Sequence, residues 1–496
     1  MRDETGIYTR IKKAYFWIIF GQGSTLLLTV FYTPILVREL GSNYGLIAIG
    51  SLVAYFIATF IDAVTAWTYN HSSKNHFKNE HQSFDVLRDK ITILSSIAMI
   101  TFWVLISTLM FSSVIEKFQL NSDVLFLFFI ALCFMQLSTF LMHQFESANY
   151  SMHKNYILQR FGVLRKLIGV MLILLYYFIR DEIVLITIIL AHGIEIIFTF
   201  IVYWKRFGQI ISSISIESDL YISLSADKFF HFIGSHILSG QASNIVLFGF
   251  SYLVAYFFEA EVIAASAAVM IFYNLFISYT SLFIKPLYSV LSENFYNSEQ
   301  SDSVLKKSRQ EIISTIFNVS LILSLLFFWI IYSFGVPLLS LWLDGLYSEY
   351  YNLLAICICA IITVIPSRSI SYTLLFSGKL FTFSVITIFV AFLAFLYSYF
   401  QSELYVEMLA YIYVIASSSA SLVTIYLSMK HANVNRMNIF RVIMLSFFAM
   451  TLCLLLTINI DELKSIILPL ILSIFVLLVF KERRVIVWAI RTLIRQ

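Results

Sequence analysis

Three basic residues, Arg160, Arg165 and Lys166, occur within one apolar segment at about 155–178. Charges kept inside apolar segments of membrane proteins are costly and commonly mark a binding or ion-transfer site. Fixed cations of this kind bind phosphate groups, and the planar guanidinium of Arg can hold two oxygens at once. Successive residues of a helix are about 100° apart, so the three side chains cannot share one face. We expect Arg165 and Lys166 to contact an anion, whereas Arg160, nearest the cytoplasmic end, either joins them or reaches toward the lipid headgroups.

An ionisable pair is predicted in the next apolar segment, at about 182–204. His192 and Glu195 are three residues apart, which places them on one helix face within reach of each other. Such a pair near the middle of a membrane can take up and release a coupling ion. The alternative is a neutral, hydrogen-bonded pair with a structural role.

Polar side chains also recur at helical spacing in the first two apolar segments. They are Gln22, Thr25, Thr29 and Thr33 in the first, and Ser51, Tyr55, Thr59, Asp62 and Thr65 in the second. Each stripe should face the protein interior and line a polar path, where Asp62 adds a carboxylate able to contact substrate or a coupling ion. The alternatives are threonines bonded to their own helix backbone and an Asp62 held by structural hydrogen bonds. His236, which shares a face with Ser239 and Ser243, is a weaker candidate because a lone His is more often a satisfied interior residue.

The chain that carries these residues is too apolar for a soluble fold. Sixty per cent of its 496 residues are apolar and 12% are charged, a balance that suits a bilayer. The pattern predicts an all-α integral membrane protein with about 14 transmembrane helices, each near the roughly 20 residues that cross the hydrocarbon core. The predicted spans are 14–38, 44–68, 90–115, 123–146, 155–178, 182–204, 228–257, 260–285, 310–334, 352–374, 380–400, 405–428, 438–458 and 463–480.

Most of the 33 Lys and Arg residues collect in every second gap between these spans or at the helix ends beside it, Arg368 and Lys379 among them. The opposite gaps hold Arg38, Lys117, Arg180 and Lys464. Cytoplasmic loops carry the excess of basic residues, so both termini are predicted to be cytoplasmic. The same placement explains the net charge of +4 without a nucleic-acid partner.

The spans predict four parts of the chain: an N-terminal lobe at 1–204, a polar cytoplasmic linker at 205–227, a C-terminal lobe at 228–430, and two further helices with an amphipathic tail at 431–496. Each lobe would hold six helices. The loops are too short for a soluble catalytic domain, so we do not expect an enzyme. We also expect no cofactor, because no nucleotide-binding motif occurs, and no metal site, because the Cys and His spacings match no common pattern.

Several short motifs resemble the polysaccharide flippases of the Wzx type, in the superfamily that includes the MATE multidrug antiporters. They are Thr33-Pro34-Ile35-Leu36-Val37-Arg38-Glu39-Leu40-Gly41 followed by Tyr44-Gly45, then Phe60-Ile61-Asp62, Leu341-Trp342 and Leu374-Leu375-Phe376-Ser377-Gly378-Lys379. The seventh span departs from the resemblance, since Gln241, Ser243 and Asn244 stand where the family often has an acidic–basic pair.

The resemblance implies two six-helix bundles in a V around a central cavity, in the bacterial inner membrane. It implies that an undecaprenyl-pyrophosphate-linked oligosaccharide crosses from the inner to the outer leaflet for O-antigen, capsule or exopolysaccharide synthesis. The expected partners are this lipid-linked oligosaccharide, membrane lipids, H⁺ or Na⁺ as coupling ion, and a glycan polymerase with its chain-length regulator. Arg165 and Lys166 would attract the diphosphate, Asp62, Gln22 and nearby hydroxyls would line the sugar path, and His192 with Glu195 would couple an ion gradient.

Three other functions remain open at this point. A MATE-like antiporter of cations or drugs would share the fold. A polytopic glycan polymerase would be expected to carry a large external loop with catalytic Arg or His, and the external gaps are short here. A peptidoglycan-precursor flippase would be expected to place several Arg residues in the first two helices, whose apolar parts contain none.

Overall fold

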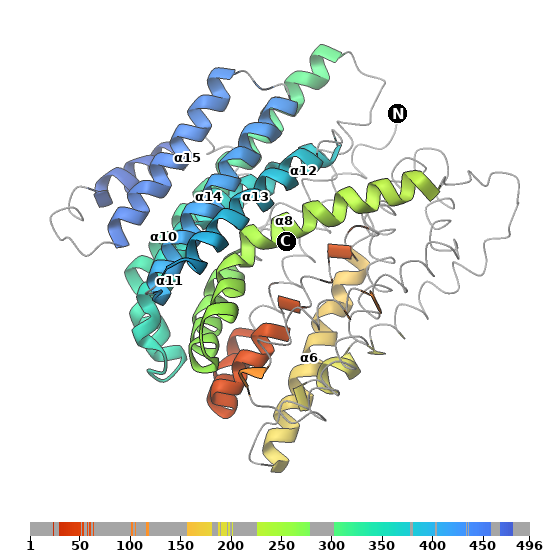
Figure 1. Cartoon of the computed structure of the whole chain (residues 1–496), viewed down its shortest axis with the longest axis vertical. Helices are drawn as coiled ribbons and strands as arrows, with labels where there is room; N and C mark the ends of the chain where they lie inside the picture. Colours follow the sequence, from red (N-terminus) through yellow and green to blue (C-terminus); the bar gives the residue numbers. More distant parts are fainter. Residues whose placement is uncertain are drawn as a thin grey trace, which may run out of the picture. The chain divides into compact units, whose positions relative to one another are not determined.

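The computed structural model describes Gly23 and residues 29–50, 52–53, 57, 59–60, 63, 101–102, 105, 116–118, 156–180, 187–188, 190–195, 197–198, 201, 226–277, 302–376, 380–401, 404–432, 434, 436–457 and 467–479. All regular structure in these residues is helical (Figure 1). The chain divides into two compact units. Unit 1 is Met1–Gln241 with Glu259–Ala264, and unit 2 is Ala242–Phe258 with Ala265–Gln496.

The helix α6, Tyr156–Arg180, is the longest helix described entirely within unit 1. Its 25 residues span about 37 Å at 1.5 Å per residue, enough to cross a bilayer. Exposed apolar side chains form one stripe along it, at Leu164, Leu167, Met171, Leu175 and Phe178. The buried residues Gly169, Val170 and Ile173 lie on the other side. In a membrane the exposed stripe faces lipid, and the opposite side faces protein.

Glycines shape the start of the described chain. The helix at 29–40 ends in the 3₁₀ turn η1, Gly41–Asn43, and a second helix continues from residue 44. Gly41 has φ +52°, a backbone conformation that favours glycine. A Cβ at Gly45 would lie 2.8 Å from the ring of Phe118 and 3.3 Å from the backbone nitrogen of Ala264. Gly45 therefore allows a close approach that any side chain would prevent.

Unit 2 is built from a series of long helices. They are α10 (Asp302–Trp342), α11 (Tyr351–Cys359), α12 (Ile361–Phe376), α13 (Leu380–Tyr399), α14 (Val406–His431) and α15 (Arg436–Thr457), with the short 3₁₀ turn η4 (Ser348–Tyr350) before α11. A shorter apolar helix follows at Ile467–Val479. Two further helices, α8 (Ala226–Phe257) and Ala260–Ile277, contribute residues to both units, and the division within α8 falls between Gln241 and Ala242.

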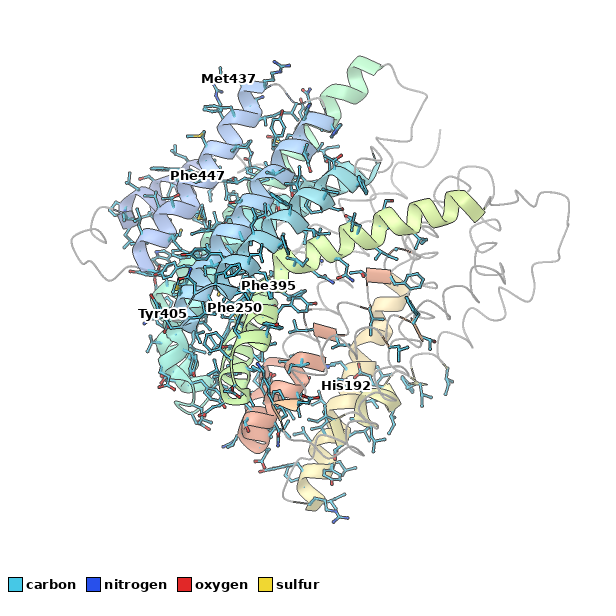
Figure 2. All side chains as sticks on the ribbon, viewed as in Figure 1. His192, Phe250, Phe395, Tyr405, Met437 and Phe447 are labelled. Atoms are coloured by element: carbon cyan, nitrogen blue, oxygen red, sulfur yellow. The ribbon has the colours of Figure 1, made fainter. Side chains whose placement is uncertain are left out.

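The centre of unit 2 is α12. It packs most extensively against α14 and α10, while α14 also packs against α13, α11 and α15 (Figure 1). The Oγ1 of Thr363 donates a hydrogen bond across the α12–α14 interface to the Oγ of Ser418, at 3.0 Å. Apolar side chains such as Met437 and Phe447 on α15 are exposed at the outer surface of the unit (Figure 2). This is the burial expected of a membrane protein whose outer helices contact lipid.

Within the described residues, six helices are long and apolar enough to cross a membrane, or seven if the bent pair Ser348–Cys359 and Ile361–Ser371 forms one span. Each coincides with a predicted span, which confirms an all-α, multi-pass membrane protein. The predicted total of about 14 spans stays a prediction. So do the predicted domain limits and the amphipathic tail, since the linker up to residue 225 and residues 480–496 lie outside the described part of the chain.

Candidate functional site

Lys166 is the predicted anion contact whose side chain the structure describes. It lies on the protein-facing side of α6, one turn before Gly169, and its Nζ is 5.4 Å from the centroid of the Tyr32 ring. Tyr32 belongs to the helix at 29–40 and is buried. A cation over an aromatic face is held by the ring quadrupole. No described carboxylate lies within ion-pair distance of Lys166, so among the described residues the Tyr32 ring is the group that stabilises its charge.

His192 and Glu195 form the pair that their spacing indicated. The Nδ1 of His192 lies 3.1 Å from the Oε2 of Glu195. The Glu195 side chain is 6% exposed and that of His192 is 34% exposed, so the carboxylate is enclosed while the imidazole is partly exposed. A role of this pair in ion coupling stays a prediction.

Gly169 brings the carboxylate close to α6. A Cβ at this position would lie 2.6 Å from Glu195 Oε2, so any other residue here would require the carboxylate to move. Since Lys166 is one turn away on the same side of α6, the glycine places a cation and a buried carboxylate in one region of unit 1. The spacing on either helix alone gave no sign of this approach between helices.

The polar stripe of the second predicted span faces the interior at Thr59. This residue is 3% exposed, and its Oγ1 accepts a hydrogen bond of 2.8 Å from the Nε2 of Gln241 on α8. A Cβ at Gly240 would lie 2.9 Å from the Cβ of Thr59, so α8 approaches the stripe closely here. Gln241 is one of the residues at which the seventh span differs from the family motif. It is hydrogen-bonded to the polar stripe of the second predicted span.

One residue of the polar stripe in the first predicted span is hydrogen-bonded to the backbone of its own helix. The Oγ1 of Thr33 donates a hydrogen bond of 2.6 Å to the carbonyl of Thr29, which is the structural alternative for a threonine in a helix. His236 lies in α8, and its Nδ1 is shielded from solvent. Roles of Thr29 and His236 in substrate binding stay predictions.

Other predicted site residues lie outside the described residues. This holds for Gln22, Thr25 and Asp62 as a whole, and for the side chains of Arg160 and Arg165, whose backbone belongs to α6. Within the described part of the chain, no group of three or more His, Cys, Asp or Glu residues is arranged to hold a metal ion.

Unit 2 contains a buried hydroxyl network that the sequence did not reveal. The hydroxyls of Tyr273 and Tyr413 are 2.6 Å apart, and Tyr413 donates to the carbonyl of Val246 at 2.8 Å or of Leu247 at 3.1 Å. Because the single hydroxyl proton of Tyr413 is donated to a carbonyl of α8, Tyr273 must be the donor between the two hydroxyls. The network therefore has a fixed direction, from Tyr273 to Tyr413 to α8.

Arg368 lies on α12, in the same unit as this network. The sequence predicts it among the cytoplasmic loop and helix-end charges, and about 12 Å of helix separates it from Phe376 at the end of α12. Of the residues in Ile361–Leu374 whose burial is described, Arg368 alone is exposed. Its placement at the cytoplasmic end of a span stays a prediction.

No family model and no curated protein matches the chain. Solved structures do. A mutant of the Vibrio cholerae MATE transporter VcmN matches with a TM-score of 0.60 at 14% identity, over 86% of this chain and 97% of that chain. An outward-facing multidrug resistance MATE family transporter of the MOP superfamily matches with a TM-score of 0.63 at 12% identity, over 87% and 96%. The MATE transporter ClbM in complex with Rb⁺ matches with a TM-score of 0.54 at 13% identity, over 87% and 97%.

At these identities the likeness concerns the fold. The chain has the fold of MATE family transporters of the MOP superfamily, along nearly the whole length of those proteins. The expected MATE-like fold is therefore confirmed, while the flippase family stays a prediction.

Proposed function

We propose that this protein is a transporter that moves undecaprenyl-diphosphate-linked oligosaccharides across the bacterial inner membrane by alternating access. Such movement requires no covalent step. It requires cations for the diphosphate, a polar path for the sugars, and two access states that exchange. The fold shared with MATE transporters supports transport, and the flippase-like sequence motifs support this class of substrate.

The proposal rests mainly on the position of Lys166 in α6. A lysine on the protein-facing side of a membrane helix is retained at a cost, and no described acid offsets it. Its interaction with Tyr32 is worth about 0.5–2 kcal/mol. A charge-assisted hydrogen bond to phosphate contributes about 1.5–3 kcal/mol, so a diphosphate competes with the ring for the ammonium group. Arg165, the residue before it, is the proposed second contact.

His192 and Glu195 are the proposed ion-coupling groups. A buried carboxylate beside a partly exposed imidazole forms a site that an incoming proton reaches through the imidazole. Asp62, Gln22, Thr25 and Thr29 are proposed to line the sugar path. A glycan polymerase and its chain-length regulator, which would use the exported repeat units, are the proposed partners.

The test is a translocation assay in proteoliposomes. A fluorescent polyprenyl-diphosphate-linked oligosaccharide is placed in one leaflet, and its appearance in the other leaflet is measured with a membrane-impermeant quencher. We expect the unsubstituted protein to move the lipid and Lys166→Gln to lower the initial rate about 10-fold or more, the effect of losing one charge-assisted contact.

Lys430 supplies the matched control. Its Nζ lies 5.8 Å from the centroid of the Tyr426 ring, but it is exposed in the last turn of α14. Lys430→Gln should therefore leave the rate within about twofold of the unsubstituted protein, since an exposed charge is screened by solvent. An equal loss from both substitutions would reject Lys166 as a substrate contact.

The antiporter alternative predicts a different result in the same vesicles. A cation or drug antiporter would extrude an organic cation such as ethidium against an ion gradient and would not move the lipid-linked oligosaccharide. The similar structures include a multidrug resistance transporter, which makes this the appropriate comparison. Ethidium export without lipid translocation would replace the proposed substrate.

A further inference from the structure

The connection between α10 and α11 exposes apolar side chains to which the proposed function gives no role. Leu341, in the last turn of α10, is 84% exposed, more than any other large apolar side chain in the described part of the chain. Leu346, in the turn that follows, is 44% exposed. Trp342 follows Leu341 in the sequence, and its ring packs against that of Phe272 with 4.8 Å between centroids. We call residues 341–350 the α10–α11 tip.

The backbone of the α10–α11 tip turns sharply. Asp344, Gly345 and Tyr347 have φ of +52°, +80° and +59°, and this left-handed conformation is rare for a side chain as bulky as that of tyrosine. The backbone nitrogen of Gly345 donates a hydrogen bond of 2.9 Å to the carbonyl of Ser340. A backbone kept in such conformations is fixed by its surroundings, so the tip has one defined shape.

Tyr351, the first residue of α11, ties the far end of the tip back to α10. Its hydroxyl donates a hydrogen bond of 3.0 Å to the carbonyl of Tyr332. Its ring lies against Gly335, where any Cβ would overlap it. Pro337, two residues further along α10, has no N–H and interrupts the hydrogen-bond ladder of the helix at this point. The two ends of the tip are therefore joined across the last turns of α10.

The helix α10 contains more apolar chain than the hydrocarbon core of a bilayer requires. Its apolar part, Gln310–Trp342, has 33 residues and is about 50 Å long at 1.5 Å per residue. No charged residue occurs between Glu311 and Asp344. To fit this length into a core of about 30 Å, a straight helix would have to tilt by about 50°, whereas membrane helices tilt by about 0–40°. One end of the apolar part therefore lies outside the core.

An exposed apolar stripe leads along α10 to the tip. Its members before Leu341 share one side of the helix and are Leu326, Trp329, Phe334 and Val336. In a membrane such a stripe faces lipid. The opposite end of α10 begins with polar and charged residues, which suit water; they include Lys306, Lys307 and Arg309. The tip is thus the end at which apolar side chains stay exposed where the helix leaves the core.

We propose that the α10–α11 tip is a preformed anchor that inserts into the bilayer surface, at the boundary between the headgroups and the acyl chains. Leu341 and Leu346 reach the acyl chains, while the exposed acid Glu349 stays in water. Trp342 and Tyr347 belong to the residue types that gather at membrane–water interfaces. The apolar side chains of interfacial segments enter this boundary by about 5–10 Å. The inference does not depend on which substrate the protein transports.

The test measures the depth of nitroxide labels by electron paramagnetic resonance, on the full-length protein in phosphatidylcholine nanodiscs. The native cysteines are changed to alanine, and each label is attached to one introduced cysteine. We expect labels on Leu341→Cys and Leu346→Cys to collide more often with O₂ than with a water-soluble nickel chelate, at a depth of about 5–10 Å into the interface. Glu349→Cys is the control in water, and its label should collide mainly with the chelate. Phe447→Cys, on an exposed position near the middle of α15, should carry the deepest label.

Three results would overturn the proposal. Labels at Leu341 and Leu346 that meet the chelate as often as the label at Glu349 would place the tip in water. A depth equal to that of the Phe447 label would place it in the hydrocarbon core. Low collision rates with both reagents would mean that protein covers the tip. If the cysteine-free chain does not fold, a photo-crosslinking amino acid at Leu341 in the unsubstituted background replaces the label, and its intact mass should show a phospholipid adduct that the same group at Glu349 does not form.

Tyr351→Phe tests whether the anchor is preformed. It removes the hydrogen bond to the Tyr332 carbonyl, so the label at Leu341 should become more mobile and lie at a shallower mean depth. Tyr411→Phe is the matched control, because the Tyr411 hydroxyl lies 3.4 Å from the Oγ1 of Thr457, between α14 and α15, and should leave the label unchanged. Unchanged mobility and depth in Tyr351→Phe would overturn the claim that the tip is held in shape by its tie to α10.

Discussion

The two units hold their buried polar groups in different surroundings. In unit 1, Lys166 lies over the Tyr32 ring, one helical turn from a glycine that contacts the buried carboxylate of Glu195. In unit 2, the buried hydroxyls of Tyr273 and Tyr413 are hydrogen-bonded to each other, and Tyr413 is bonded to carbonyls of α8. Among the described residues, the first region contains ionisable groups of both signs, and the tyrosine network consists of hydroxyl groups joined by hydrogen bonds.

The difference indicates a division of roles. A carboxylate and an imidazole can change their protonation, so unit 1 is suited to coupling an ion to substrate binding. Tyrosine hydroxyls form hydrogen bonds of defined direction, so the network of unit 2 is suited to joining its helices. The following substitutions test whether the surroundings of these polar groups determine how much each contributes to stability.

The largest effect is expected from removing one partner of the unit 1 pair. His192→Leu leaves an enclosed carboxylate without its imidazole partner and should lower the free energy of unfolding by about 3 kcal/mol. Glu195→Leu should cost only about 1 kcal/mol, because the imidazole left behind is 34% exposed and can be hydrated. Denaturation in mixed micelles measures both values.

The double variant provides the control for this prediction. Adding Glu195→Leu to His192→Leu removes this buried carboxylate as well, so stability should rise above that of His192→Leu alone. Equal losses of stability from the two single variants would mean that the burial of Glu195 does not determine the change in the free energy of unfolding. The contrast drawn between the two units would then be wrong.

A smaller effect is expected from substitution of Gly169, which allows the Glu195 carboxylate to approach α6 closely. Gly169→Ala places a Cβ 2.6 Å from Glu195 Oε2 and should cost about 2 kcal/mol through displacement of the buried group. Gly193→Ala is the matched control, since a Cβ there would meet nothing within 4 Å and alanine favours helix, by up to about 1 kcal/mol. Thermal midpoints in detergent should therefore move in opposite directions.

Sequence patterns predicted the features that depend on one helix. Hydropathy located the helices of unit 2, and the spacing of His192 and Glu195 gave their contact because the geometry of a single turn fixes it. Contacts between helices were not predictable in this way. Gly169 looks like any small residue until a second helix is placed beside it, and Tyr273 and Tyr413 are 140 residues apart in segments that read as uniformly apolar.

The bend between α11 and α12 was not predictable for a related reason. Hydropathy places 352–374 in one span. In the structure the helices on either side of Ala360 are bent by 42°, about one and a half turns before Pro366, and α12 continues to Phe376. A break that depends on tertiary packing is not visible in average hydropathy.

The smallest effect is expected from the two tyrosines of unit 2, where the direction of the network predicts an asymmetry. Tyr413→Phe removes the acceptor of the buried Tyr273 hydroxyl and should cost about 1–2 kcal/mol, the penalty for a buried donor that loses its partner. Tyr273→Phe should cost about half as much, because Tyr413 still donates to the carbonyls of α8. Chemical denaturation measures this difference.

Equal costs for the two tyrosine variants would mean that the Tyr273 hydroxyl has another acceptor. The network would then not run in one direction from Tyr273 through Tyr413 to the carbonyls of α8.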